Sequence, residues 1–148
     1  KVPANWDYVR RAVSIRDDFF AKHVGGEKTL IFGNGDVSSI EQAYKRVEET
    51  GADGVMIGRG IFGNPWLFRS RAPYMPSIRE KLEALCEHTM LYEKLLGDIK
   101  NFAIMKKHFK AYVNGFDGAK ELRVRLMETE NAQQVRAIVE DYIKDTHL

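Results

Sequence analysis

Two short stretches combine apolar residues with glycines in a pattern that suits phosphate binding. The first covers residues 31–37 (Ile-Phe-Gly-Asn-Gly-Asp-Val) and the second residues 54–60 (Gly-Val-Met-Ile-Gly-Arg-Gly). Each is typical of a short buried strand that runs directly into a glycine loop. A glycine loop that leads into a helix presents backbone N–H groups to an anion, and the guanidinium of Arg59 can donate two hydrogen bonds to phosphate oxygens. The two stretches together predict one phosphate site.

Glycines at the ends of strands are also common turn residues, so either loop taken alone has a purely structural explanation. The order of the elements favours the ligand site, because the last two loops of a parallel barrel typically form its phosphate site. Between the loops, Ser38 and Glu41 have the spacing of a capping box. A helix is therefore predicted from about residue 38 to residue 50, with Gly51 as its C-terminal stop.

The elements around these loops predict an α-β-α-β order in residues 1–72. Strands are expected at 28–32 and 54–57. Two strands cannot form a parallel sheet alone, so we expect this half to belong to a larger barrel or to pair with another chain, and its exposed strand edges predict self-association. The first helix is expected to be capped by Asn5, to end at Gly25 and Gly26, and to bury Trp6, Val9, Val13, Phe19 and Phe20.

Residues 73–148 carry the signals of helices only. After Pro73 and Pro76, apolar residues recur at helical spacing in 78–85, 102–113 and 135–143, and a shorter helix is expected within 117–127. This half is predicted to be a small helical bundle with its own core. The fold class is therefore α/β plus α.

Basic residues are concentrated in one segment, although the 148-residue chain has a formal charge of only +2. Residues 98–125 hold seven lysines and arginines against three acidic residues, with aromatic side chains between them. Such a surface could contact an RNA backbone, and a solvated helix face explains the lysines equally well. The candidate RNA-binding residues are Lys100, Lys106, Lys107, His108, Lys110 and Arg123.

Other features exclude several classes of protein. The single cysteine, Cys86, rules out an internal disulfide framework and lies next to an apolar helix face, which favours a structural thiol over a nucleophile. No apolar run approaches the roughly 20 residues of a membrane helix, and no signal peptide or metal-binding motif is recognised. We expect a cytoplasmic protein without a metal or a membrane partner, and the absence of an initial methionine suggests a fragment.

Three motifs stand out in order along the chain: residues 33–36 (Gly-Asn-Gly-Asp), 53–60 (Asp-Gly-Val-Met-Ile-Gly-Arg-Gly) and 63–68 (Gly-Asn-Pro-Trp-Leu-Phe). In this order and spacing they resemble the tRNA-dihydrouridine synthases, flavin enzymes that use FMN and NADPH to reduce a uracil ring in tRNA. Residues 105–108 (Met-Lys-Lys-His), with Tyr112, Gly115 and residues 121–123, are similar to the helical domain of the family, and residues 4–6 (Ala-Asn-Trp) are similar to its Ala-Asp-Trp element.

The resemblance implies that residues 1–72 are the C-terminal part of an FMN-binding (β/α)8 TIM barrel and that residues 73–148 are a helical tRNA-binding domain. It implies that Asn34, Gly35, Asp36, Gly58 and Arg59 hold the FMN phosphate and the adjoining ribityl end. A carboxylate would repel phosphate, so we expect Asp36 to cap the helix, to accept a hydrogen bond from a ribityl hydroxyl, or to accept one from Arg59.

The resemblance also implies that the catalytic cysteine of the family, and the lysine and histidine around the flavin ring, lie upstream of Lys1. No catalytic residue is therefore predicted in this chain, and the chain alone is expected to be inactive. Two other readings stay open: another FMN-dependent barrel oxidoreductase acting on a small metabolite, and an RNA-binding module without catalysis. The basic helical half argues against the first, and the missing barrel strands favour the second.

Overall fold

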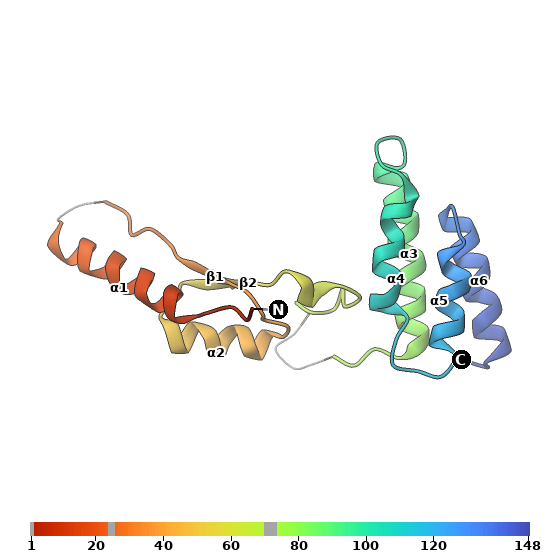
Figure 1. The fold of residues 1–148 in the computed structure, drawn as a ribbon, viewed down its shortest axis with the longest axis horizontal. Helices are drawn as coiled ribbons and strands as arrows, with labels where there is room; N and C mark the ends of the chain where they lie inside the picture. The colour runs from red at the N-terminus through yellow and green to blue at the C-terminus, as the bar shows by residue number, and fades with distance from the viewer. Residues whose placement is uncertain (1, 24–25, 70–73) are drawn as a thin grey trace. The chain divides into compact units, whose positions relative to one another are not determined.

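The computed structural model describes residues 2–23, 26–69 and 74–148 (Figure 1). The chain divides into two compact units. The α/β unit contains Lys1–Ile61 and Leu67–Pro73, and the helical unit contains Phe62–Trp66 and Tyr74–Leu148. The predicted domain boundary between residues 72 and 73 lies outside the described residues, as does Gly25.

The α/β unit has the element order α1 (Asp7–Lys22), β1 (Phe32–Asn34), α2 (Ile40–Thr50), β2 (Gly54–Met56) and the 3-10 helix η1 (Arg59–Ile61). The two strands pair in parallel, with Phe32 opposite Gly54 and Asn34 opposite Met56. The predicted α-β-α-β order and the parallel pairing are confirmed. Because parallel strands end at the same edge of a sheet, the two glycine loops leave from one edge.

The first strand begins later than the predicted 28–32. The carboxylate of Asp53 accepts the backbone N–H of Ile31 at 2.8 Å, and the N–H of Asp53 donates to the carbonyl of Ile31 at 2.9 Å. Since a side chain takes the Ile31 donor, the regular ladder starts only at Phe32.

The expectation that both strands are buried is wrong for part of their side chains. Phe32 is 58% exposed and Met56 is 59% exposed. A parallel sheet is buried only where other layers cover both of its faces. The described residues supply a sheet of two strands, which leaves these two side chains uncovered.

The helix after β1 starts one residue later than the predicted capping box. Ser39, not Ser38, is the N-cap of α2, and its hydroxyl accepts the N–H of Gln42 at 3.2 Å. The Gln42 side chain in turn accepts the N–H of Ser38 at 2.9 Å. The predicted stop is confirmed, because Gly51 has a φ of 72° and donates its N–H to the carbonyl of Val47.

The first helix differs from its prediction at both ends. Asn5 is not the N-cap, which is Trp6, but the Asn5 side chain accepts the N–H of Asp7 at 2.9 Å. Phe19 is exposed, since the buried stripe of α1 passes through Val13 and Arg16, and the Phe19 ring stacks on His23 instead.

The helical unit contains α3 (Ile78–Leu96), the 3-10 helix η2 (Phe102–Met105), α4 (Lys106–Tyr112), α5 (Ala119–Met127) and α6 (Ala132–Asp145). The helices predicted from the apolar spacing are therefore present, including the short one within 117–127. They share one core, which consists of Leu82, Leu85, Met105, Phe109, Tyr112, Val113, Ala119, Leu122, Leu126, Val135 and Val139.

Residues Phe62–Trp66 also belong to the helical unit. Gly63 has a φ of 72°, and a Cβ atom added there would lie 2.1 Å from the carbonyl oxygen of Ala111 in α4. The Phe62 ring meets the edge of the His108 ring at a centroid distance of 5.1 Å. The glycine therefore lets this segment pack directly on the backbone of α4.

Candidate phosphate site and basic groove

The loops that follow β1 and β2 line a single open hollow of about 630 Å³, which we call the phosphate hollow. All five residues predicted to bind the cofactor line it. Its lining residues are Asn34, Gly35, Asp36, Val37, Ser38, Met56, Gly58, Arg59 and Gly60. The parallel register produces this convergence, because Asn34 lies opposite Met56 and each chain then turns into its own loop.

Three glycines shape the phosphate hollow. Gly35 has a φ of +123°, which a residue with a side chain rarely adopts. A Cβ atom added at Gly60 would lie 2.9 Å from the Cα of Ser38, so the two loops approach closely at this point. A Cβ added at Gly58 would meet no atom within 4 Å, so the backbone of Gly58 is open to a ligand.

Arg59 and Asp36 face each other across the phosphate hollow. The Arg59 guanidinium lies 3.3 Å from the Asp36 carboxylate, and the second Asp36 oxygen accepts the backbone N–H of Ala4 at 2.8 Å. The predicted contact with Arg59 is confirmed, whereas Asp36 does not cap α2, because Ser39 does. The Arg59 side chain is 66% exposed, so this ion pair is weak and the guanidinium remains accessible to an anion.

An ion pair between Arg16 and Asp53 lies directly before β2, and it was not predicted from the sequence. Arg16 is buried in α1, donates to the Asp53 carboxylate, and also donates to the carbonyl of Thr29 at 3.2 Å. The hydrogen bond from the Ile31 N–H and the pairing with Arg16 lower the pKa of Asp53. Two features of the sequence could have indicated this ion pair: Arg16 lies on the same helix face as Val13, and Asp53 comes directly before a predicted strand.

Four of the six candidate RNA-binding residues lie on one surface. Helices α4 and α5 form an open groove of about 650 Å³, which we call the basic groove. Its lining residues are Lys106, Lys107, Phe109, Lys110, Lys120, Arg123, Val124, Met127 and Glu128. Five cationic side chains against one carboxylate give the groove a positive charge. Lys120 was not among the candidates, although its position in the basic segment could have indicated it.

The other two candidates lie elsewhere. Lys100 lies between α3 and η2 and does not line the basic groove. His108 packs against His88, at a ring-centroid distance of 5.3 Å, and against Phe62. Burial, and then the neighbouring His88 and Lys107, lower the pKa of His108, which favours a neutral imidazole at pH 7. Within the basic groove, Arg123 donates to the carbonyl of Val113 at 2.8 Å, so it also supports the fold.

The match to known proteins decides the family. The family model described as dihydrouridine synthase (Dus) matches residues 19–147. The chain belongs to the dihydrouridine synthase family. It is 36% identical over 143 residues to a probable tRNA-dihydrouridine synthase of Staphylococcus aureus (strain MRSA252) and 34% identical over 143 residues to probable tRNA-dihydrouridine synthase 2 of Bacillus subtilis (strain 168). The predicted resemblance is thus confirmed.

Each alignment covers 96% of this chain and 42% of the relative. The chain therefore spans about two fifths of the length of the curated relatives that it matches.

The described residues offer few other reactive groups. Burial raises the pKa of the Cys86 thiol to about 11, so the thiol stays protonated at neutral pH and is a poor nucleophile. Over residues 2–23, 26–69 and 74–148, no group of three or more histidine, cysteine, aspartate or glutamate side chains is arranged to hold a metal ion. None of the helices in the described ranges is both long and apolar enough to cross a membrane.

Proposed function

We propose that this chain is the C-terminal part of an FMN-dependent tRNA-dihydrouridine synthase, which reduces uridine in tRNA to 5,6-dihydrouridine with NADPH. Family membership and the names of the relatives support the reaction class. The observation that carries the proposal is the convergence of two glycine loops and Arg59 on one hollow. In this proposal the catalytic residues belong to a part of the enzyme outside this chain.

The residues of the phosphate hollow fit the phosphate end of FMN. The open backbone at Gly58 and the accessible guanidinium of Arg59 are suitable donors for a dianion. Asp36 balances the charge of Arg59 and offers its carboxylate to a ribityl hydroxyl. Bound FMN would supply hydride transfer to the pyrimidine ring. The role of this chain is to hold the phosphate end and so to orient the cofactor.

The basic groove fits the backbone of tRNA. In this proposal Lys106, Lys107 and Lys110 contact phosphates, and Lys120 and Arg123 extend the contact along α5. A uracil must leave the base stack to reach a flavin, so the enzyme has to hold the RNA on both sides of the target base. A positively charged surface appended to the cofactor-binding part serves that purpose, whereas a small metabolite would not need it.

We further propose that β1 and β2 are the last two strands of a (β/α)8 TIM barrel in a cytoplasmic enzyme. The position of a phosphate site after these strands agrees with the usual site in that fold. The exposed side chains of Phe32 and Met56 would then be covered by the other strands. In the isolated chain, the same uncovered strands would favour self-association.

The reaction is tested with the full-length protein, FMN, NADPH and a tRNA transcript that lacks dihydrouridine. Mass spectrometry of the digested tRNA should show a uridine that has gained two hydrogens, only when FMN is present. A colourless protein that leaves the transcript unchanged would contradict the assignment. If such a protein still bound tRNA, it would be an RNA-binding module without catalysis.

The tRNA surface is tested by the salt dependence of binding. Replacing Lys106, Lys107 and Lys110 with alanine should lower the slope of log K against log salt by about 2–3, because each phosphate contact releases a condensed cation. The control variant replaces three exposed lysines that lie outside the basic groove, Lys45, Lys94 and Lys144. Equal slopes for the wild type and the groove variant would show that the groove is merely solvated.

A further inference from the structure

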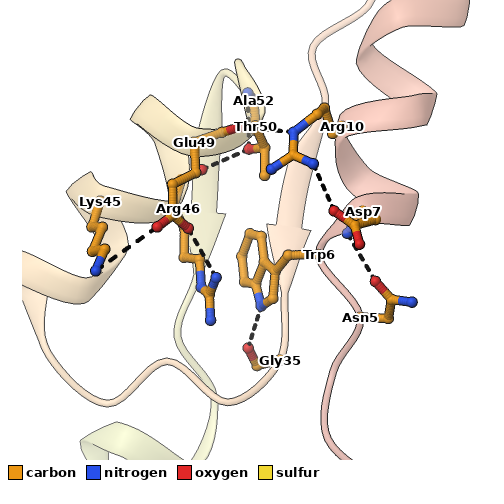
Figure 2. A network of polar contacts seen from close by, with 10 residues as sticks. All are labelled: Asn5, Trp6, Asp7, Arg10, Gly35, Lys45, Arg46, Glu49, Thr50 and Ala52. Atoms are coloured by element: carbon orange, nitrogen blue, oxygen red, sulfur yellow. Dashed lines mark hydrogen bonds and ion pairs between the residues drawn. The ribbon is translucent and has the colours of Figure 1, made fainter.

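Trp6 contacts the first phosphate loop but does not line the phosphate hollow. It is only 6% exposed. Its indole N–H donates to the carbonyl of Gly35 at 3.0 Å, and Figure 2 shows the ring nitrogen directed at that oxygen. The six-membered part of the indole lies against Gly33, where an added Cβ would be 2.2 Å from Cζ3 of the ring. Any side chain at position 33 would therefore collide with the indole ring, so this packing requires glycine there.

The bond to the Gly35 carbonyl determines which way the next N–H points. In a trans peptide the carbonyl and the following N–H lie on opposite edges of one plane, and the described residues contain no cis peptide. Because the Gly35 carbonyl faces Trp6, the N–H of Asp36 faces away from Trp6. Asp36 lines the phosphate hollow, so this orientation suits donation to an anion there.

The neighbours of Trp6 restrict its movement. The Arg46 guanidinium lies over the indole at 5.3 Å from the ring centroid and donates to the Glu49 carboxylate at 2.9 Å. Arg10 donates to the backbone carbonyl of Glu49 at 3.0 Å, which ties α1 to α2 (Figure 2). Trp6 therefore lies at the start of a helix that is fixed to the next one.

We infer that Trp6 is a positioning residue for the phosphate: its indole N–H holds the Gly35–Asp36 peptide in the orientation that presents a donor to the anion. The inference rests on the proposed function, because it takes the phosphate hollow to bind the FMN phosphate. Trp6 touches neither the anion nor the flavin ring and acts only through the peptide that it holds. Its effect should therefore depend on whether the ligand carries a phosphate.

The experiment compares FMN with riboflavin, which has the same ring and ribityl chain but no phosphate. Flavin fluorescence gives the Kd of each ligand for the full-length protein. Trp6→Phe keeps an aromatic ring and removes the N–H donor, so it should weaken FMN binding about tenfold and leave riboflavin binding within about twofold. Trp66→Phe is the matched control, because Trp66 is in the helical unit, and it should change neither Kd.

Each result separates the inference from the proposed function. If the wild type binds FMN no more tightly than riboflavin, the proposal that the phosphate hollow binds the FMN phosphate is refuted, and the role of Trp6 is refuted with it. If the wild type prefers FMN and Trp6→Phe keeps that preference, only the role of Trp6 is refuted. Equal weakening of both flavins also refutes it, since Trp6 would then support the fold in general.

A second measurement needs no folded variant. In the wild type, the indole N–H resonance of Trp6 should shift when FMN is added and should shift much less with riboflavin. A Trp6 resonance that responds equally to both flavins, or to neither, would overturn the inference.

Discussion

Replacing Arg59 with alanine tests the charge balance of the phosphate hollow. A unit charge about 4 Å from a phosphate dianion gains about 2 kcal/mol at the dielectric constant of water and more at a protein surface. The variant also loses the exposed ion pair with Asp36, which contributes at most about 1 kcal/mol. The net loss of FMN binding should therefore be about 1.5–3 kcal/mol, or roughly 10- to 150-fold in Kd.

Flavin fluorescence on the full-length protein measures this change, again with FMN and riboflavin side by side. The affinity for riboflavin should stay within about twofold, because the charge interaction requires the phosphate. Arg11→Ala is the control, since Arg11 is an exposed arginine on α1 that does not line the phosphate hollow. An Arg59→Ala protein that still prefers FMN as strongly as the wild type would refute the proposed role of the guanidinium.

Two further predictions concern the helical unit. Gly63→Ala should lower the free energy of unfolding, measured by chemical denaturation, by about 3 kcal/mol, because the backbone has a positive φ and the new Cβ would clash with the Ala111 carbonyl. Gly115→Ala is the matched control: its φ of 77° is similar, but an added Cβ would meet no atom within 4 Å, so the loss should be only about 1 kcal/mol. Equal losses would show that the packing on α4 is unimportant. Lowering the pH through 6.5 should lower the Tm. Burial holds the pKa values of His88 and His108 below the ordinary histidine value of 6.5. The unfolded chain therefore takes up protons that the folded chain does not, and the folded state loses stability as the pH falls. Replacing both histidines with glutamine should flatten this dependence, and an unchanged pH profile of the double variant would contradict it.

The sequence pattern predicted that the two glycine loops lie close together, and they line one hollow. The pattern of an apolar strand followed by a glycine loop occurs twice, with one helix between the two copies. A crossover helix between two strands favours parallel pairing, which brings both loops to one edge of the sheet. The helical core was equally predictable from the 3.6-residue spacing of apolar side chains.

The errors arose where distant residues compete with local preferences. The ladder begins at Phe32 because the Asp53 side chain takes the Ile31 N–H. The basic segment does not form one surface, because α4 has two sides: His108 packs against His88, while Lys106 lines the groove with residues of α5. The contact of Trp6 with Gly35 spans 29 residues and no local pattern predicts it.

A crystal structure of the full-length protein with FMN tests the central claim most directly. We expect the phosphorus atom in the phosphate hollow, with its oxygens within hydrogen-bond distance of the Arg59 guanidinium and of backbone N–H groups from both loops. A flavin whose phosphate binds anywhere else, and leaves Arg59 paired only with Asp36, would contradict the account.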